Sequence, residues 1–475
     1  MESWMRILPE GILSVGGTIV LAVCALGPQE PMRNFLRWLS LLFVSAAAFA
    51  LMMTHGIANA DADTWTITTA VTTSFSMVLL AMTGWVIAAG SAPVRGGGEW
   101  FALLQFVGVG ALILTRASNL TAVFLGVEVL SIALYVLVAF HYEKKSALRA
   151  GALYLALAGF ASAFLIFGAA LVYAAYGTLK IIELRDALSA SPVEAISPVA
   201  LVGFALFLAG VGFKLAAVPF HMWAADVYEA APSAISGGIA AISKGATIAA
   251  FIPFLFLVKS HFYAIAFMAA ASMIIGNLLG LRETRVKRIL AYSSVAHVGY
   301  ILLGYLAARD TELGNGATRG VTPILFYVAV YGFSALGAFV SLAALRPDGN
   351  VNLNQLHGAA RKHPVISACL LIFILSLAGL PLPATAGFWG KLYLFSAAFQ
   401  AGYMKLAILG LIGSAIGLFY YLRIIVHLFM VAPEAGERIT PEYSGLQTGI
   451  LVATATAVVV FGILPDSLLR LLIVQ

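Results

Sequence analysis

The sequence predicts an all-α polytopic membrane protein with about fourteen transmembrane helices. Apolar residues make up 61% of the 475 positions and charged residues only 10%. Such a chain has too few charged side chains to cover a water-soluble domain of this size, so lipid must surround most of it. A spanning helix and its loop occupy roughly 30 to 35 residues, so the chain length also allows ~14 spans.

Each predicted element is an apolar stretch of roughly 16 to 37 residues, bounded by polar connections. The first is interpreted as a retained span because Arg6 alone precedes it and no convincing signal-peptide cleavage site follows. No connection is long enough to form a soluble domain, so residues 1–475 are expected to form one membrane domain. In order, the stretches cover 9–27, 34–55, 70–90, 100–115, 118–140, 148–176, 198–224, 233–258, 262–281, 288–307, 321–345, 364–400, 405–430 and 447–472.

The seventh and twelfth stretches carry prolines close to a lysine. Pro219 follows Lys214, and Pro381 and Pro383 precede Lys391. A proline cannot donate a backbone hydrogen bond, so both helices are predicted to be broken there. Their offset of five helices reverses the direction of entry and predicts two inverted repeats with binding sites at the breaks.

These repeats divide the single membrane domain by residue number. Residues 1–98 hold helices 1–3, residues 99–258 the first inverted repeat (helices 4–8), residues 259–430 the second (helices 9–13), and residues 431–475 helix 14. The odd-numbered connections carry twice as many arginines and lysines as the even-numbered ones. The positive-inside rule therefore places odd connections in the cytoplasm and both termini on the outer face.

Several functional classes are excluded by composition. Cys24 and Cys369 stand apart in apolar stretches, so the chain has no iron–sulfur ligand set and no expected metal site. The net charge of +6 is not gathered in a basic segment interleaved with aromatic residues, which argues against nucleic-acid binding. Lys391 does not belong to a phosphate loop, because Thr385 stands where the first glycine is needed and Leu392 where Ser or Thr is needed.

Lys214 is the strongest candidate functional residue. It lies far from either end of an apolar stretch, where a charge costs several kcal/mol. Glu128, the only acid in the fifth stretch, shares a helical face with Ser131 and Tyr135 and is its expected ion-pair partner. A movable carboxylate would let the ammonium alternate between holding and releasing a proton. Snorkelling of Lys214, or a static packing pair, is the competing interpretation.

Three further buried positions extend this set, and one weaker candidate joins it. Lys244 is flanked by small residues that leave room for water, and Lys391 is interpreted as a gate or exit site. His297 heads a polar stripe on the tenth stretch, and an imidazole is suited to relaying protons. His221, two helical turns after Lys214, is the weaker candidate. Static packing is the alternative for each of them.

Three segments carry a resemblance to a known family. The stretches KLAAVPFHMWAADVYEAAP from Lys214, SGGIAAISKGA from Ser236 and KRILAYSSVAHVGY from Lys287 resemble the antiporter-like membrane subunits of respiratory complex I. The resemblance covers about ten central helices. It implies that Glu128 and Lys214 are the ion pair, Lys244 and His297 the central relay and Lys391 the output residue.

Two differences from the other subunit types narrow the resemblance to the N-type subunit. A lysine at position 391 argues against the M-type, which has glutamate there, and the ending after the fourteenth stretch leaves no room for the lateral helix of the L-type. An N-type subunit is a proton-translocating part of NADH:quinone oxidoreductase that couples quinone reduction elsewhere to proton movement, with no redox chemistry of its own.

The resemblance also implies partners and location. No cofactor or metal is expected in this chain; NADH, FMN, iron–sulfur clusters and quinone are expected in other subunits. Expected partners are the M-type antiporter-like subunit, small K-, J-, A- and H-type subunits and membrane lipids, in a bacterial inner membrane with both termini periplasmic. A stand-alone cation/proton antiporter and a scaffold subunit with static buried ion pairs remain the alternatives.

Overall fold

The computed structural model describes residues 5–26, 29–54, 66, 69–90, 97–190, 192–308, 317–346, 351–381, 385–432 and 444–472. These residues form helices, turns and three isolated bridges, with no β-strand among them. Thirteen of the described helices are long and apolar enough to cross a membrane. The prediction of an all-α polytopic membrane protein is confirmed.

In the N-terminal half, several helices begin and end at residues that favour helix caps. Thr69 accepts a hydrogen bond from the Thr72 amide at the start of α4, and Asn119 accepts one from the Ala122 amide at the start of α6. Helix α7 ends at Gly177, whose φ of 69° suits glycine. The helices are α2 (Leu8–Leu26), α3 (Gln29–Thr54), α4 (Ala70–Ala89), α5 (Gly97–Thr115), α6 (Leu120–Val138), α7 (Lys145–Tyr176) and α8 (Ile181–Ala190), with η1 (Val193–Ala195) after them.

The next spans are interrupted, as the prolines and glycines suggest. The predicted stretch 198–224 is helical only to Leu215, after which the chain turns before a new short helix. The following span changes to a π-helical turn immediately before Lys244. The elements are α9 (Pro198–Leu215), α10 (Met222–Ala230), α11 (Ser233–Gly238), the π turn η2 (Ile239–Ser243), α12 (Lys244–Phe251) and η3 (Ile252–Phe254).

The C-terminal half repeats the pattern of long helices and one broken span. Helices α17 and α18 together make the predicted twelfth stretch and so bring the spans to about fourteen. The fourteenth stretch was predicted to continue to residue 472, but it ends at Ile463, and Pro465 begins a separate short helix. The elements are α13 (Leu257–Arg282), α14 (Val286–Ala307), α15 (Ala317–Leu345), η5 (Leu353–Leu356), α16 (Ala359–Lys362), α17 (Pro364–Ala378), α18 (Ala386–Gln400), α19 (Met404–Phe429), α20 (Gly445–Ile463) and α21 (Pro465–Leu472).

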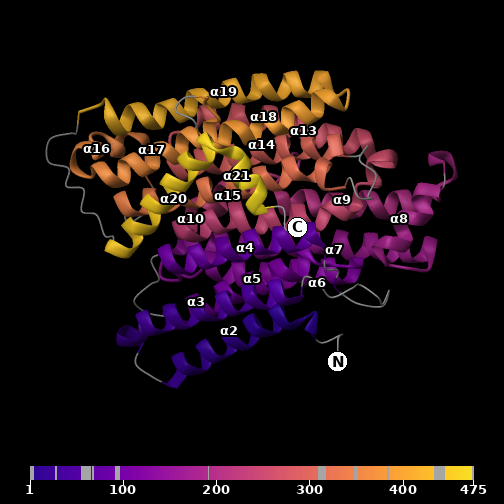
Figure 1. The fold of residues 1–475 in the computed structure, drawn as a ribbon, viewed down its shortest axis with the longest axis horizontal. Helices are drawn as coiled ribbons and strands as arrows, with labels where there is room; N and C mark the ends of the chain where they lie inside the picture. Colours follow the sequence, from indigo (N-terminus) through magenta and orange to yellow (C-terminus); the bar gives the residue numbers. More distant parts are fainter. Residues whose placement is uncertain are drawn as a thin grey trace.

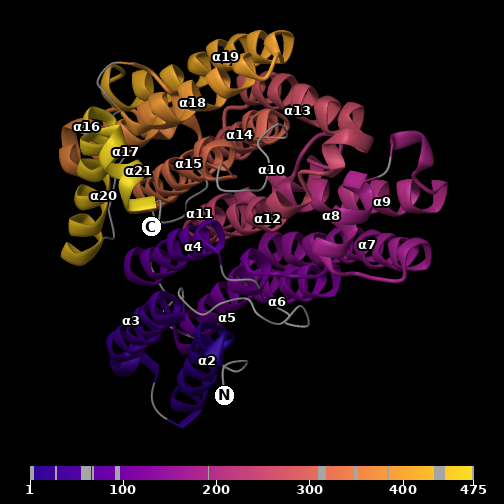
Figure 2. The ribbon, with the colours of Figure 1, turned by 45° about the vertical axis from the view of Figure 1, so that its right-hand side comes forward.

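The helices lie side by side with the most buried ones in the middle. In both views α2 and α3 lie on one side of the molecule and α19 on the other, with α14 and α15 between them, and Figure 2 shows α11 and α12 in this interior as well (Figures 1 and 2). The interior helices α11, α12, α14 and α15 are almost fully buried, whereas only about a third of the residues of α7, α19 and α20 are buried. The exposed faces are apolar, as a lipid-facing surface requires.

Candidate functional site

The basic residues singled out by the sequence are buried inside the helical bundle. Lys214 is 3% exposed, Lys244 1%, Lys391 6% and His297 3%. A snorkelling lysine would keep its ammonium group at the surface, so this interpretation is excluded for all three lysines. Their contacts therefore have to come from the protein interior.

Lys214 lies in the last turn of α9, just before the helix breaks. Ala216 adopts the left-handed conformation with a φ of 55°, which turns the chain away from the helix axis. The Lys214 Nζ donates a hydrogen bond to Ser131 Oγ on α6. It also lies 5.9 Å from the centre of the Tyr135 ring and 5.6 Å from that of Tyr154, where aromatic faces attract a cation.

Glu128 does not form the direct ion pair with Lys214 that the sequence suggested. Among the described residues its carboxylate has no salt bridge to Lys214 and instead accepts a hydrogen bond from Ser162 on α7. Ser131, the lysine's own partner, lies one helical turn after Glu128. The two charges are thus near neighbours in a serine-rich site, each satisfied by a hydroxyl group.

A small cavity lies beside Lys214 on the side of α12. Its volume is about 10 Å³, and apolar side chains line it together with Lys214 and Thr247. Thr247 follows Lys244 by one turn, so the cavity lies between the two lysines' helices. A volume of this size is close to the ~10–15 Å³ that one water molecule needs.

Lys244 begins α12, directly after the π-helical turn. Its Nζ donates to Ser294 Oγ at 2.8 Å and to the Ser294 carbonyl at 3.2 Å, and it lies 5.9 Å from the centre of the Tyr228 ring. Such π turns widen a helix locally and are frequent at functional positions. Among the described residues no carboxylate forms an ion pair with Lys244.

His297 lies in the middle of α14, one turn after Ser294. Its Nδ1 is hydrogen bonded to the Tyr327 hydroxyl, and its Nε2 to the Tyr421 hydroxyl at 3.1 Å. The Tyr421 hydroxyl is also hydrogen bonded to Ser293 Oγ. Both imidazole nitrogens therefore have hydroxyl partners that can either donate or accept a proton.

Lys391 on α18 binds the end of the preceding half of the broken span. Its Nζ donates to the Ala378 carbonyl at 2.7 Å and to Ser414 Oγ at 2.8 Å. The Tyr300 ring lies 5.3 Å below the ammonium group. Helix α17 ends at Gly379, whose φ of 70° and whose contact with the Lys391 side chain both require glycine.

Of the two prolines at this second break, only Pro381 is among the described residues. Pro381 lies in the turn after α17, and Pro383 lies outside the described residues. The helix end leaves backbone carbonyls without helical partners, as predicted, and Lys391 satisfies one of them.

His221 does not join the lysines. It lies half-buried in the turn between α9 and α10, and its Nδ1 is buried without a hydrogen-bond partner in the described structure. Asp226 and Glu229, on the following helix α10, are paired with Arg288 and Arg285, with a distance of 2.6 Å from Glu229 Oε1 to Arg285 Nη1.

Several buried polar groups escaped the sequence analysis. Tyr327 and Tyr421 lie in strongly apolar helices, where tyrosine is common as a core residue, so only the fold reveals that they meet His297. Lys287, at the start of α14, is buried and donates to the Ala231 carbonyl at 2.7 Å. Arg116, just after α5, forms a buried ion pair with Glu10 at 2.7 Å.

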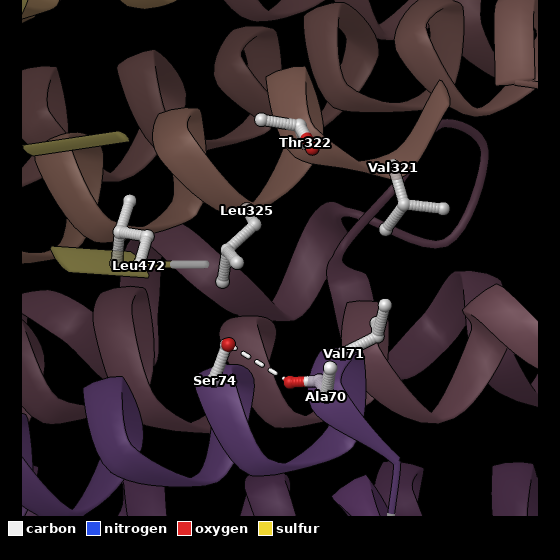
Figure 3. A pocket seen from close by; sticks show the side chains of 7 residues that line it. All are labelled: Ala70, Val71, Ser74, Val321, Thr322, Leu325 and Leu472. Atoms are coloured by element: carbon white, nitrogen blue, oxygen red, sulfur yellow. Dashed lines mark hydrogen bonds between the residues drawn. The ribbon is translucent and has the colours of Figure 1, made fainter. Parts of the chain in front are cut away.

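A second cavity lies away from these residues, between α4, α15 and α21. Its volume is about 20 Å³, and its lining is apolar apart from Ser74 and Thr322 (Figure 3). The Ser74 hydroxyl already donates to the Ala70 carbonyl at 2.8 Å. This cavity contains no charged side chain and offers no link to the buried lysines.

The fold and the row of buried basic residues define the class: a polytopic helical membrane protein of the antiporter-like type. Residues 117–417 match the family described as NADH:quinone oxidoreductase/Mrp antiporter, TM. The match covers more than half of the chain, and the protein belongs to this family. This match, together with relatives named NADH-quinone oxidoreductase subunit N, confirms the resemblance to the N-type antiporter-like subunit of complex I.

Relatives with curated names and solved structures are similar to this chain over most of its length. NADH-quinone oxidoreductase subunit N of Trichlorobacter lovleyi is 34% identical over 98% of this chain and 95% of its own length. NADH-quinone oxidoreductase subunit N 2 of Acidobacterium capsulatum is 40% identical over 78% of this chain and 76% of its own. A chain of respiratory complex I from Thermus thermophilus is similar with a TM-score of 0.83 and 29% identity, covering 97% of this chain and 98% of that one. A chain of the Mrp complex from Dietzia sp., at 20% identity and a TM-score of 0.82 over 99% of this chain and 96% of that one, shares the fold.

Proposed function

We propose that this protein is the N-type proton-translocating membrane subunit of an NADH:quinone oxidoreductase. Quinone reduction in other subunits would drive proton movement along its buried glutamate, lysine and histidine residues. The observation that carries the proposal is that Lys214, Lys244 and Lys391 hydrogen bond to hydroxyl and carbonyl groups, with no ion-pair partner among the described residues.

Neutral hydrogen-bond partners allow a buried lysine to lose its proton at a lower free-energy cost than a carboxylate partner would. In a buried ion pair, deprotonation leaves an uncompensated carboxylate, which costs several kcal/mol. A serine hydroxyl can exchange hydrogen bonds with either an ammonium or a neutral amine, so neither protonation state is left unsatisfied. These lysines are therefore suited to hold a proton and to release it.

The order of transfer follows the contacts between neighbouring residues. The proton would pass from Lys214, beside Glu128, across the small cavity near Thr247 to Lys244. Lys244 contacts Ser294, one turn before His297 on α14, and the histidine and its tyrosines lead toward Lys391. A neighbouring subunit would trigger the first step by changing the Glu128 site, and Lys391 would release the proton to the outer face.

The proposal also covers the orientation of the chain in the membrane, its two repeats and its neighbouring subunits. The odd-numbered connections would face the cytoplasm and both termini the periplasm of a bacterial inner membrane. Residues 99–258 and 259–430 would be the two inverted repeats that carry the broken helices. The M-type subunit and small K-, J-, A- and H-type subunits would be its neighbours, while NADH, FMN, the iron–sulfur clusters and quinone would bind elsewhere in the complex.

The first prediction tests the proposal at Lys214. Replacing Lys214 by Ala in the assembled complex should lower proton pumping in vesicles by about tenfold or more, because the route loses its first proton carrier. Coupled NADH:quinone turnover should fall with it. The control is Lys145→Ala, an exposed lysine at the start of α7 that should leave both activities unchanged. Unchanged pumping in the Lys214 variant would remove this residue from the route.

A stand-alone cation/proton antiporter is the alternative within the same family. It would use the same buried lysines but would exchange ions along their gradients. Purification from the native membrane separates the two: the proposed subunit should co-purify with quinone-reducing activity, and a stand-alone antiporter should not.

A further inference from the structure

Asn277 on α13 is a buried amide with all of its principal hydrogen-bonding groups engaged. It is 1% exposed. Its Nδ2 donates to the Met273 carbonyl at 2.6 Å and to the Tyr300 hydroxyl at 3.1 Å, and its Oδ1 accepts from the Tyr420 hydroxyl at 2.9 Å. Three partners on three helices meet at this one side chain.

The Met273 carbonyl determines which way the amide faces. A backbone carbonyl can only accept, so the NH₂ group must point toward Met273 and Tyr300. The amide oxygen then faces Tyr420, whose hydroxyl has to donate to it. The direction of both tyrosine hydrogen bonds is thus determined by Asn277.

The two tyrosines connect Asn277 with the surroundings of His297 and Lys391, two residues of the proposed route. The Tyr420 ring packs against Tyr421, with centroids 4.6 Å apart, and the Tyr421 hydroxyl binds His297. On the other side, Tyr300 lies under Lys391 and beside Ser414, which accepts from the lysine. The Tyr300 ring also lies against His297, with centroids 5.7 Å apart, so Asn277 is linked through its two tyrosines to both His297 and Lys391.

Two glycines of α19 make room for this amide. A Cβ at Gly413 would lie 3.1 Å from Asn277 Nδ2. A Cβ at Gly417 would lie 2.8 Å from Asn277 Oδ1 and 3.1 Å from the Tyr420 hydroxyl, which is too close for the present arrangement. The close approach of α13 and α19 is therefore built around the side chain of Asn277.

We propose that Asn277 is a positioning residue for proton transfer between His297 and Lys391, an inference that rests on the proposed function. A carboxamide does not accept a proton at oxygen and hand one on at nitrogen under these conditions, so it carries no proton itself. Because Tyr300 accepts from the amide, its own hydrogen is free for an acceptor on the Lys391 side. Because Tyr420 donates to the amide, its hydrogen is held away from the Tyr421 hydroxyl.

The test compares Asn277→Leu with Asn277→Asp in the assembled complex in vesicles, measuring protons pumped per NADH oxidised across a range of pH. Asn277→Leu should lower this ratio by about fivefold at every pH, because both tyrosines lose their partner. Asn277→Asp should show the same deficit at high pH and recover as falling pH protonates the carboxyl, which then offers one donor and one acceptor again. Each variant is compared with the parent complex at the same pH.

The pH readout separates positioning from packing. The charged and titratable side chains that the contacts above place closest to the site are His297 and Tyr300 on α14, Lys391 on α18, and Tyr420 and Tyr421 on α19; Arg423 lies further along α19. They are common to all variants, so a recovery confined to Asn277→Asp belongs to the new carboxyl. Equal, pH-independent deficits in both variants would overturn the proposal, as would a Leu variant that pumps normally.

Two glycine variants provide a second test and its control. Gly417→Ala should reproduce the deficit by displacing the amide and Tyr420, whereas Gly449→Ala on α20 has open space and should not. If the Leu variant fails to assemble, the Asp variant, nearly identical in size, decides the matter by its pH dependence. Lys391→Ala tests the proposed function separately: normal pumping there would refute the route itself, while loss of pumping there with normal Asn277 variants would refute only this inference.

Discussion

A basic residue can remain inside a membrane protein only if its surroundings replace the water it has lost. At Lys214 the replacement is one serine hydroxyl and two tyrosine faces, and at Lys391 it is a helix-end carbonyl and a serine. Each of these partners tolerates a neutral amine as well as an ammonium ion. This common chemistry distinguishes the lysines from Arg116, which stays paired with Glu10.

The same reasoning gives Tyr421 a testable role beside His297. Tyr421→Phe removes the hydroxyl that binds both His297 Nε2 and Ser293 while keeping the aromatic ring. We expect proton pumping to fall by about fivefold to tenfold, since the histidine loses one of its two hydroxyl partners. The amount of assembled complex should change little.

Tyr176→Phe is the matched control for this prediction, because Tyr176 lies half-buried at the end of α7, away from the histidine. Pumping and NADH oxidation are measured together in vesicles. A Tyr421 variant that pumps as well as the control would show that His297 does not need this hydroxyl.

At the scale of helices, the breaks in the spans decide where the site lies. Helix α9 ends one residue after Lys214, α12 begins at Lys244, and α18 presents Lys391 to the last carbonyls of α17. Helix ends leave backbone carbonyls unpaired, and in a bilayer these must be satisfied by the protein or by water. The breaks therefore supply polar groups at a depth where a continuous helix would supply none.

The buried ion pair between Glu10 and Arg116 joins α2 to the end of α5. Arg116 donates to both carboxylate oxygens of Glu10, at 2.7 and 2.9 Å, and to the Arg6 carbonyl at 2.6 Å. Removing one partner leaves an uncompensated charge inside the protein. Glu10→Gln should therefore lower stability by ~3 kcal/mol or more.

The measurement for this prediction is the thermal unfolding midpoint of the purified complex, or the fraction of subunit that remains assembled on heating. The double replacement Glu10→Gln with Arg116→Met removes both charges and should recover much of the loss. A single variant as stable as the parent would show that this pair contributes nothing to the attachment of α2. Proton pumping per assembled complex should be unchanged in both variants.

At the scale of the whole molecule, the buried basic residues lie on helices that pack against one another inside the bundle. Helices α12, α14 and α15 lie in the interior, between α5 on one side and α18 and α19 on the other (Figure 2). Under the proposed function, a proton would pass from helix to helix through this interior before it leaves, which suits a subunit that receives its signal from a neighbour in the same membrane.

The orientation of the chain yields the last prediction. The positive-inside rule places Arg361 on the cytoplasmic face and Lys405 on the outer face. Both side chains are exposed, whereas the native Cys24 and Cys369 are buried. In intact cells a membrane-impermeant thiol reagent should label Lys405→Cys and should label Arg361→Cys only after the membrane is opened. The opposite pattern would invert the proposed topology.

The amino-acid sequence by itself determined the membrane class, about fourteen spans, the two breaks and the burial of the three lysines. These properties depend on hydrophobicity, proline and the cost of burying charge, which are local quantities. The partners of those lysines could not be predicted, because Ser131, Ser294 and Ser414 come from distant parts of the chain. The expected Glu128–Lys214 interaction stays a prediction, because in the described structure each of the two side chains hydrogen bonds to a serine.

The same limit applied to Tyr327, Tyr421 and Asn277, which are ordinary residues of apolar helices until packing brings them beside His297 and Lys391. Only the tertiary structure decided which hydroxyls face which nitrogen, because hydrogen-bond partners depend on how helices far apart in sequence are turned and spaced. The sequence alone predicts that charged side chains lie within the bilayer. Their neutral, exchangeable surroundings exist only once α6, α9, α14, α18 and α19 have packed together.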